Sequence, residues 1–332
     1  MSLPLSLFFI NLMFLTHLQS VSSSLLLPFE ISFNADKIKF YSISTQGVPH
    51  EIKLLDNSSL QFSPIKRKAR TIIVIHGFAV PTSFMLANRW LIRIYMKKYQ
   101  FGDNLILVDW SALSTRGYNI FDSPFLYPMA VGNVAKTGDR VAHFIKWMHS
   151  EGAIDFDGIH LIGISLGAHV AGHVGTAIQQ TNGGKKISRI TGLDPAGPLY
   201  YPSHQELNLD KTDANFVDIY HSNMGLYGGR ALDGHVDFII NNGRSQPGCN
   251  TVTDIFFCSH NFATFLFADT IKKSYVACKC SPNDENDQSL NQCPTQCPNP
   301  VNVGLHTSNS TRGVYRISAR NVPQYFRTIQ LD

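Results

Sequence analysis

Short runs of apolar, often β-branched residues recur along the chain and alternate with longer stretches whose apolar residues have helical spacing. The short runs predict strands and the spaced stretches predict helices. Strands are expected at 71–75, 104–109, 158–163, 187–193, 216–220 and 235–240, and helices at about 83–99, 131–149, 166–180 and 260–273. This alternation is typical of an α/β fold with a mostly parallel central sheet and helices on both faces.

Residues 1–20 are largely apolar and contain no charged side chain. The stretch is too short to span a bilayer but has the length of the apolar region of a signal peptide. We expect a signal peptide over residues 1–22 and a secreted, extracellular chain, with a short N-terminal anchor as the alternative. Residues 25–332 can bury a full core and are expected to form one domain, with no later segment apolar enough to cross a membrane.

The charge and the motifs of the chain narrow the choice of binding partners. The formal net charge of +4 and the isoelectric point near 8.7 favour contact with anionic surfaces only mildly. Nothing resembles a nucleic-acid-binding module or a phosphate-binding loop, so we expect no nucleic-acid partner and no cofactor. His169 and His173 lie four residues apart on a predicted helix, but no glutamate separates them, and we expect no metal site. The basic run 66–70 is expected to be a solvated turn, with docking on anionic lipid as the alternative.

All six cysteines lie after residue 248. An even number in a secreted chain argues for three disulfides, although six cysteines allow fifteen pairings and the sequence selects none of them. The oxidising compartment and the spacing of the last four cysteines disfavour a zinc site. The cysteines are Cys249, Cys258, Cys278, Cys280, Cys293 and Cys297. Asn57 and Asn309 begin glycosylation sequons, which fit the same compartment.

The strongest chemical signal is Gly163-Ile164-Ser165-Leu166-Gly167, which lies between an apolar run and the start of a predicted helix. A serine between two glycines in this context is typical of a strand-turn-helix elbow that exposes a nucleophilic hydroxyl. The N–H group of Leu166 would then lie at a helix N-terminus, where it can stabilise a developing oxyanion. The pattern therefore predicts Ser165 as a nucleophile.

Acyl transfer also needs a second oxyanion donor and an acid. The predicted strand 71–75 is followed by His76-Gly77-Phe78, so the N–H of Phe78 could reach the site, although a simple glycine turn is the alternative. Asp194 ends the predicted strand 187–193 and precedes a proline. This position suits the triad acid of a parallel sheet, and an ordinary turn former is the alternative.

The base should follow Asp194, because α/β-hydrolases have the chain order serine, acid, histidine. Spacing cannot choose among the candidates, which are His204, His221, His235, His260 and His306. His260 is expected on a loop at the start of a helix, a position that suits a base whose ring must be fixed. His221 and His235 fall at strand ends and have the alternative of a purely structural role.

Four motifs in this order resemble the pancreatic-lipase family from about residue 35 to the C-terminus, and within it the secreted phospholipases A1 of the wasp-venom type. Ile164 departs from the family, where many members have histidine, but it occupies the variable position of its motif. The motifs are Ile75 to Phe78, Gly163 to His169, Gly192 to Pro198, and Cys258-Ser259-His260.

The resemblance implies an α/β-hydrolase fold and assigns the roles. Ser165 is the implied nucleophile, Asp194 the acid and His260 the base, with the N–H groups of Phe78 and Leu166 as the oxyanion hole. It also implies that Cys249 and Cys258 pair at the two ends of a lid. Pancreatic lipases carry a further C-terminal β-sandwich after the hydrolase domain. No such domain is expected here, so we expect a monomer that meets a phospholipid membrane or micelle interface without colipase.

Two loops carry the implied substrate class. Triacylglycerol lipases of this family have a long lid and a second long loop above the site, whereas here the corresponding segments are Asn250 to Phe257 and Ser222 to Gly234. Short loops leave room for a polar head group and remove the wall for a third acyl chain. The resemblance therefore implies a phospholipase A1 that hydrolyses the sn-1 ester. The alternatives are a triacylglycerol lipase or galactolipase, and a catalytically silent, yolk-type lipid-binding protein.

Overall fold

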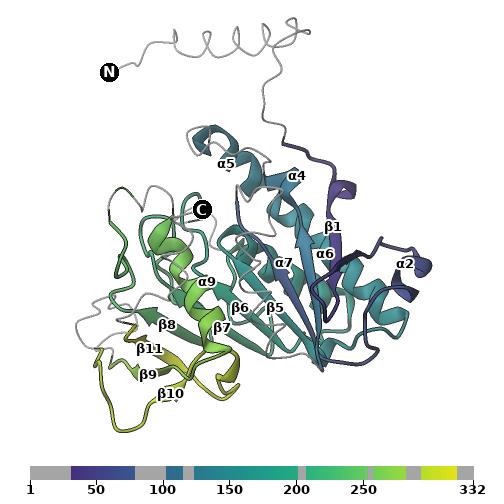
Figure 1. Cartoon of the computed structure of the whole chain (residues 1–332). Helices are drawn as coiled ribbons and strands as arrows, with labels where there is room; N and C mark the ends of the chain where they lie inside the picture. Colours follow the sequence, from purple (N-terminus) through teal and green to yellow (C-terminus); the bar gives the residue numbers. More distant parts are fainter. Residues whose placement is uncertain are drawn as a thin grey trace, which may run out of the picture.

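The computed structural model describes residues 31–78, 102–114, 123–200, 207–250, 252, 257–281 and 293–319 (Figure 1). The signal peptide expected at 1–22 and the helix expected at 83–99 lie outside these residues. The described strands form one sheet in the order β10-β9-β11-β8-β7-β6-β5-β3-β4-β1-β2. They are β1 (Lys39–Ile43), β2 (Pro49–Glu51), β3 (Thr71–Ile75), β4 (Asn104–Asp109), β5 (Ile159–Ile164), β6 (Arg189–Leu193), β7 (Phe216–His221), β8 (Val236–Ile240), β9 (Val276–Lys279), β10 (Val301–Asn302) and β11 (Gly313–Ile317).

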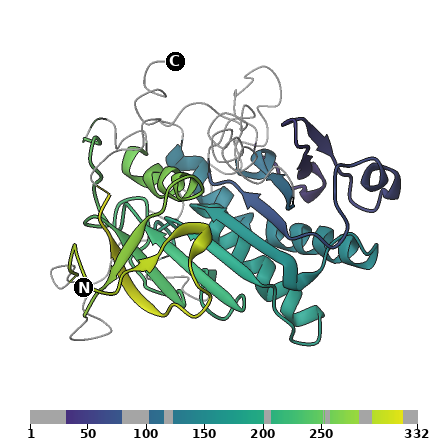
Figure 2. The ribbon, with the colours of Figure 1, turned by 60° about the horizontal axis from the view of Figure 1, so that its bottom comes forward.

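The centre of the sheet is parallel. The strands from β4 through β3, β5, β6, β7 and β8 to β11 all pair in parallel, whereas β1 and β2 at one edge and β9 and β10 at the other pair antiparallel. Figure 2 shows these edges as the purple and the yellow-green ends of the ribbon. All six predicted strands are present, and the expected α/β fold with a mostly parallel central sheet is confirmed. The outermost strands β2 and β10 were not predicted, because they have three and two residues and none of these is buried. Strands β1, β9 and β11 were not predicted either.

The helices differ from expectation mainly at their starts. The helix expected from residue 131 is divided into α5 and α6 at Asn133, whose buried amide donates to the carbonyl oxygens of Ser32 (3.0 Å) and Leu113 (2.9 Å). The helix expected from residue 260 begins at Cys258. The described helices are η1 (Ala35–Lys37), α2 (Asn57–Gln61), α4 (Ser111–Ser114), α5 (Ser123–Gly132), α6 (Val134–Ser150), η3 (Phe156–Gly158), α7 (Leu166–Thr181), α9 (Cys258–Thr270) and η6 (Gly304–His306).

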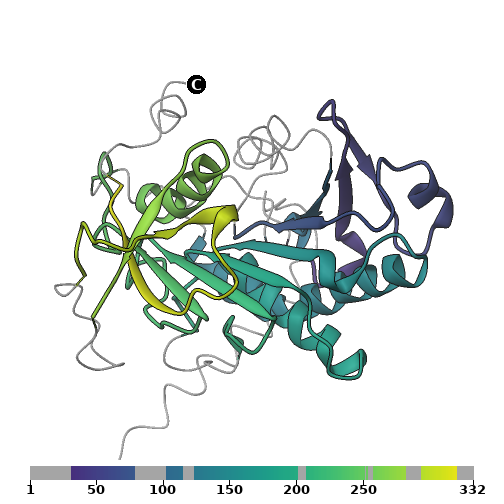
Figure 3. The same ribbon diagram turned by 90° about the horizontal axis from the view of Figure 1, so that it is seen from below.

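Each face of the sheet packs against its own helices, as Figure 3 shows with α9 on one side and α6 and α7 on the other. Along β3, Ile73 and Ile75 belong to the core that includes α6 and α7. Ile72 and Val74 belong to the core that includes α9. A strand buried on both faces is apolar at every position, which is why it appears in the sequence as a continuous run.

The parallel centre determines where functional groups can meet. Strands β3, β5, β6 and β7 are neighbours, and their carboxyl ends lie at one edge of the sheet. The residues that follow them are His76, Ser165, Asp194 and Ser222. In open α/β sheets this edge is where ligands bind. None of the described helices is long and apolar enough to cross a membrane.

Candidate active site

Ser165 occupies a sharp turn between β5 and α7. Its backbone angles are φ 55° and ψ −121°, a conformation that non-glycine residues rarely adopt. The flanking glycines make the turn possible, because a Cβ at Gly163 would lie 2.4 Å from the Cα of Ala168 and one at Gly167 would lie 2.2 Å from the carbonyl oxygen of Ile75. The Ser165 N–H donates to the carbonyl oxygen of Leu193 at 3.0 Å. The structure therefore forms the predicted elbow, with the Ser165 side chain half-buried.

The backbone after β3 lies against this serine. A Cβ at Gly77 would be 2.9 Å from the Ser165 Cβ and 3.4 Å from its hydroxyl oxygen. His76 fixes the loop, because its Nδ1 donates to the Gly77 carbonyl oxygen (2.7 Å) and its Nε2 accepts from the Trp110 N–H (3.1 Å). The Phe78 peptide follows directly, and Leu166 is the first residue of α7. The expected oxyanion donors, the N–H groups of Phe78 and Leu166, thus belong to peptides that lie next to Ser165.

Asp194 directly follows β6 and is fully buried. One carboxylate oxygen, Oδ1, accepts from the N–H groups of Ser222 (2.7 Å) and Asn223 (3.0 Å), which follow β7. The other, Oδ2, lies 2.5 Å from Nδ1 of His260. Gly228 packs on the carboxylate so closely that a Cβ there would be 2.6 Å from both oxygens. Backbone groups thus hold this aspartate and turn one oxygen toward the histidine.

His260 lies within the first turn of α9, whereas the sequence suggested a loop just before the helix. Because Nδ1 donates to Asp194, Nε2 is the ring nitrogen left to act as a base. Two aromatic rings flank the imidazole, with the centroid of Tyr227 at 5.8 Å and that of Phe257 at 5.9 Å. These rings also contact each other at 4.5 Å, which joins the β7–β8 loop to the last residue of the lid. The rest of the lid, apart from Asn250 and Val252, lies outside the described residues.

The remaining candidate histidines have other surroundings. His221 bonds to Asp237 (2.8 Å), and His235 accepts the Val217 N–H (3.0 Å). His306 lies in η6, and His204 falls outside the described residues. Only His260 among the described histidines has a hydrogen bond to Asp194 in the structure.

The two helix histidines have structural roles. His169 donates through Nε2 to the Ala196 carbonyl oxygen (2.8 Å) and accepts the Leu209 N–H at Nδ1 (3.2 Å). Burial lowers the pKa of His169 to about 4, so its ring is neutral at neutral pH. His173 pairs with Asp139 at 2.8 Å. No group of three or more potential metal ligands occurs within the described part of the chain.

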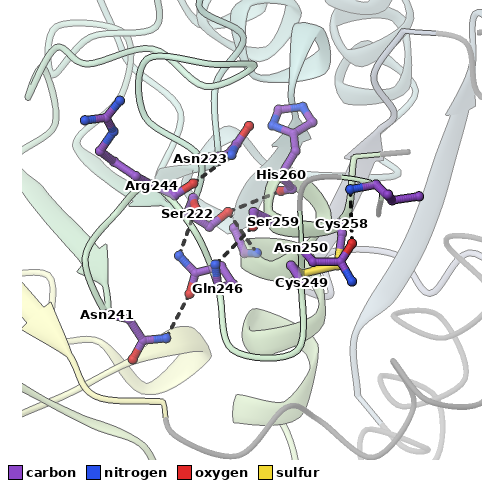
Figure 4. The surroundings of a disulfide bond; sticks show 12 residues. Ser222, Asn223, Asn241, Arg244, Gln246, Cys249, Asn250, Cys258, Ser259 and His260 are labelled. Carbon is purple, nitrogen blue, oxygen red and sulfur yellow. Dashed lines mark hydrogen bonds between the residues drawn. A yellow bond between two sulfur atoms is a disulfide. The ribbon is translucent and has the colours of Figure 1, made fainter. Parts of the chain in front are cut away.

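Gln246 was not singled out from the sequence, yet it braces the site (Figure 4). Its buried amide donates to the carbonyl oxygens of Ser222 (2.8 Å) and Ile240 (3.1 Å), and its backbone N–H donates to the Ser259 hydroxyl (3.0 Å). The Ser222 hydroxyl in turn donates to the His260 carbonyl oxygen at 3.2 Å. This network connects the start of α9 to the end of β7. The same residue, Gln246, therefore supports both His260 and the N–H groups that hold Asp194.

The six cysteines form three disulfides: Cys249–Cys258, Cys278–Cys297 and Cys280–Cys293. The first is the pairing that the family resemblance implies, and Figure 4 shows it beside the Gln246 network with the His260 ring pointing away from it. It joins Cys258, the first residue of α9, to the segment that follows Gln246. The other two connect β9 and the residue after it to the segment 293–297.

The carboxyl edge of the parallel sheet thus carries a serine at a strand-turn-helix elbow and a histidine held by a buried carboxylate. This combination is typical of serine hydrolases with the α/β-hydrolase fold. The chain belongs to the lipase family, whose model matches residues 26–315.

Lipase member H of Xenopus tropicalis is 37% identical over 257 residues, which cover 74% of this chain and 52% of that protein. Lipoprotein lipase of Mus musculus is 33% identical over 246 residues, covering 68% and 46%. The chain thus spans about half the length of these curated relatives. Among solved structures, an alpha/beta hydrolase enzyme from a Medee basin deep-sea metagenome library is 14% identical, with a TM-score of 0.31, and the match covers 60% of this chain and 70% of that one.

Proposed function

We propose that the chain is a secreted phospholipase A1 that hydrolyses the sn-1 acyl ester of phospholipids to a lysophospholipid and a fatty acid. In this proposal Ser165 is the nucleophile, His260 the base and Asp194 the acid that orients it. The protein acts as a monomer at a phospholipid membrane or micelle surface, with no metal, organic cofactor or colipase-type partner.

In the proposed reaction each residue has a defined role. The Ser165 hydroxyl attacks the ester carbonyl carbon while His260 Nε2 takes its proton, and Asp194 stabilises the resulting imidazolium. The carbonyl oxygen, now negative, accepts hydrogen bonds from the N–H groups of Phe78 and Leu166. Collapse of the intermediate expels the glycerol oxygen, which His260 protonates, and leaves an acyl group on Ser165. Water then attacks this acyl-enzyme with His260 again acting as base, and the fatty acid leaves.

The observation that carries the choice of substrate is the shortness of the two loops beside His260. The disulfide that closes the lid joins residues only nine positions apart, and β8 begins at Val236 soon after β7 ends at His221. A lid tied at both ends over so short a span has little reach. The short β7–β8 loop packs on Asp194 through Gly228, and in this proposal it leaves room for a polar head group.

Secretion has separate support. The three disulfides require an oxidising compartment to persist, and the sequon asparagines Asn57 and Asn309 are both exposed. We therefore propose glycosylation at these two sites in the secreted protein, following removal of the signal peptide at residues 1–22.

The test compares fatty-acid release by purified protein from phospholipid, galactolipid and triglyceride that carry the same acyl chains, each presented in the same detergent micelles. We expect phospholipid to be cleaved fastest and long-chain triglyceride poorly, and Ser165→Ala to abolish release from all three. Preference for triglyceride or galactolipid would replace the proposal with one of these alternatives. Absence of release from every substrate by the wild-type protein would favour a silent lipid-binding protein.

A further inference from the structure

A second buried histidine–carboxylate pair lies next to the one proposed for catalysis. His221 ends β7, and its Nε2 is 2.8 Å from Oδ1 of Asp237 on β8. Both residues are 2% exposed. The other Asp237 oxygen accepts the N–H of Gly234 at 3.1 Å. The proposed reaction makes no direct use of this pair.

The position of His221 connects it to the acid. The two residues that follow it, Ser222 and Asn223, supply the N–H groups that hold Asp194 Oδ1. The direction of these N–H groups depends on the backbone at the end of β7. A hydrogen bond that anchors the His221 ring to β8 therefore also fixes the cradle of Asp194.

The charge of the pair follows from its partners. Asp237 has two hydrogen-bonding partners, the His221 ring and the Gly234 N–H, and it lies in the same buried region as Asp194. Two buried carboxylates without a compensating cation would be very costly. A cationic His221, with a proton on both ring nitrogens, would balance the charge of Asp237 in this region.

The groups around His221 agree with this state. Asp237 faces it from β8, Asp194 from the end of β6 and Asp233 from the β7–β8 loop, while the neutral His169 of α7 lines the same small cavity of about 10 Å³ as His221 and Asp233. Burial alone would lower the pKa of His221, but the hydrogen bond to Asp237 and the charges of the three aspartates raise it above its ordinary value. Nδ1 is buried without a hydrogen-bond partner among the described residues, and the cavity has room for one water, which would accept a hydrogen bond from a protonated Nδ1.

We propose that His221 is a positioning residue for the hydrolytic site: as an imidazolium paired with Asp237, it fixes the end of β7 that cradles Asp194 and compensates the charge of that carboxylate. This inference rests on the proposed ester hydrolysis, but it does not depend on which ester is preferred.

Two substitutions separate the two parts of the role, with a simple nitrophenyl ester as substrate. His221→Ala removes both the anchor and the charge, and kcat should fall about tenfold or more because Asp194 loses its fixed position. His221→Gln keeps an N–H donor for Asp237 but carries no charge. It should restore most of the kcat, while the acid limb of the kcat/KM profile moves to higher pH by roughly half a unit, since His260 is protonated more easily when a nearby cation is lost.

His160→Gln is the matched control. His160 is also buried in the sheet, where its Nε2 bonds to the Thr191 hydroxyl at 2.7 Å, but it lies near the amino end of β5, away from the site. This control should move neither kcat nor the acid limb. If folded His221→Ala and His221→Gln proteins have the same kcat and the same acid limb as the His160→Gln control, His221 is only structural and the proposal is wrong.

An activity-independent measurement keeps the inference distinct from the proposed function. Side-chain nitrogen NMR of the wild-type protein should show His221 as an imidazolium at pH 7, whether or not any ester is cleaved. A neutral His221 ring at that pH would overturn the proposal even in a protein that proves to be an active phospholipase.

Discussion

At the scale of single residues, the proposed chemistry falls on three side chains from three different elements. Ser165 projects from a turn that strains its backbone, and Asp194 has a positive φ of 45° as well. Such conformations cost of order 1 to 3 kcal/mol each and persist only where the surrounding structure determines them. Here the flanking glycines, Gly228 and the N–H groups after β7 do so.

The triad can be tested by its pattern of losses. Ser165→Ala and His260→Ala should each lower turnover by roughly 10^6, and the double variant should be little worse, because the two groups act as one unit. Asp194→Asn should lose less, on the order of 10^4, because the geometry survives while the imidazole tautomer is wrong. Steady-state ester hydrolysis measures all four. Near wild-type turnover by Ser165→Ala would end the acyl-enzyme proposal.

Asp213 gives a prediction about pH and stability. Burial raises its pKa to about 7, despite hydrogen bonds from the Asp210 N–H and the Thr176 hydroxyl that lower it. The folded state therefore binds a proton between about pH 4 and pH 7 that the unfolded state releases, so this residue makes the protein less stable as the pH rises through that window. Asp213→Asn cannot titrate, and it should lose less stability between pH 5 and pH 8 than the wild type, by on the order of 1 to 3 kcal/mol.

Urea unfolding of both proteins at the two pH values measures the difference for Asp213. Comparing each protein with itself removes the constant effect of the substitution on packing. Parallel changes in the two proteins would show that Asp213 titrates near its ordinary value.

At the scale of elements, the loop between β7 and β8 packs directly on the Asp194 carboxylate through Gly228. Gly228→Ala would place a methyl group 2.6 Å from both Asp194 oxygens, so the carboxylate must move and His260 with it. We expect activity to fall at least about tenfold, since small displacements of catalytic groups are costly. Gly132→Ala, where nothing lies within 4 Å of the added Cβ, should leave activity unchanged. Equal activities in these two variants would contradict the described packing of the loop.

The lid disulfide belongs to the same scale. Replacing Cys249 and Cys258 by serine opens a loop of nine residues' separation, which should cost ~2–3 kcal/mol and also loosen the start of α9 beside His260. Replacing Cys280 and Cys293, separated by thirteen residues, should cost a similar free energy but leave activity intact where the protein stays folded. Thermal unfolding and ester hydrolysis separate the two effects. An equal loss of activity in both variants would show that the Cys249–Cys258 disulfide has no special role at the site.

At the scale of the whole molecule, the sequence predicted the strands of the parallel sheet centre except β11. Strands such as β3 are buried on both faces and appear as continuous apolar runs, and the elbow carries its own pattern of glycines. The edge strands β2 and β10 have no buried residue to reveal them. The roles of Gln246 and His221 could not be predicted either. They depend on hydrogen bonds between segments 24 and 16 residues apart, and no local pattern specifies such contacts.

Hydrolysis of the sn-1 ester is tested most directly with a phospholipid that carries different acyl chains at sn-1 and sn-2. The measurement identifies the first fatty acid released. Purified protein is mixed with these micelles and the products are analysed by mass spectrometry at early times, before acyl groups migrate. We expect the sn-1 acid and the matching lysophospholipid from the wild-type protein, and neither product from Ser165→Ala. Initial release of the sn-2 acid, or unchanged release by Ser165→Ala, would contradict the proposal.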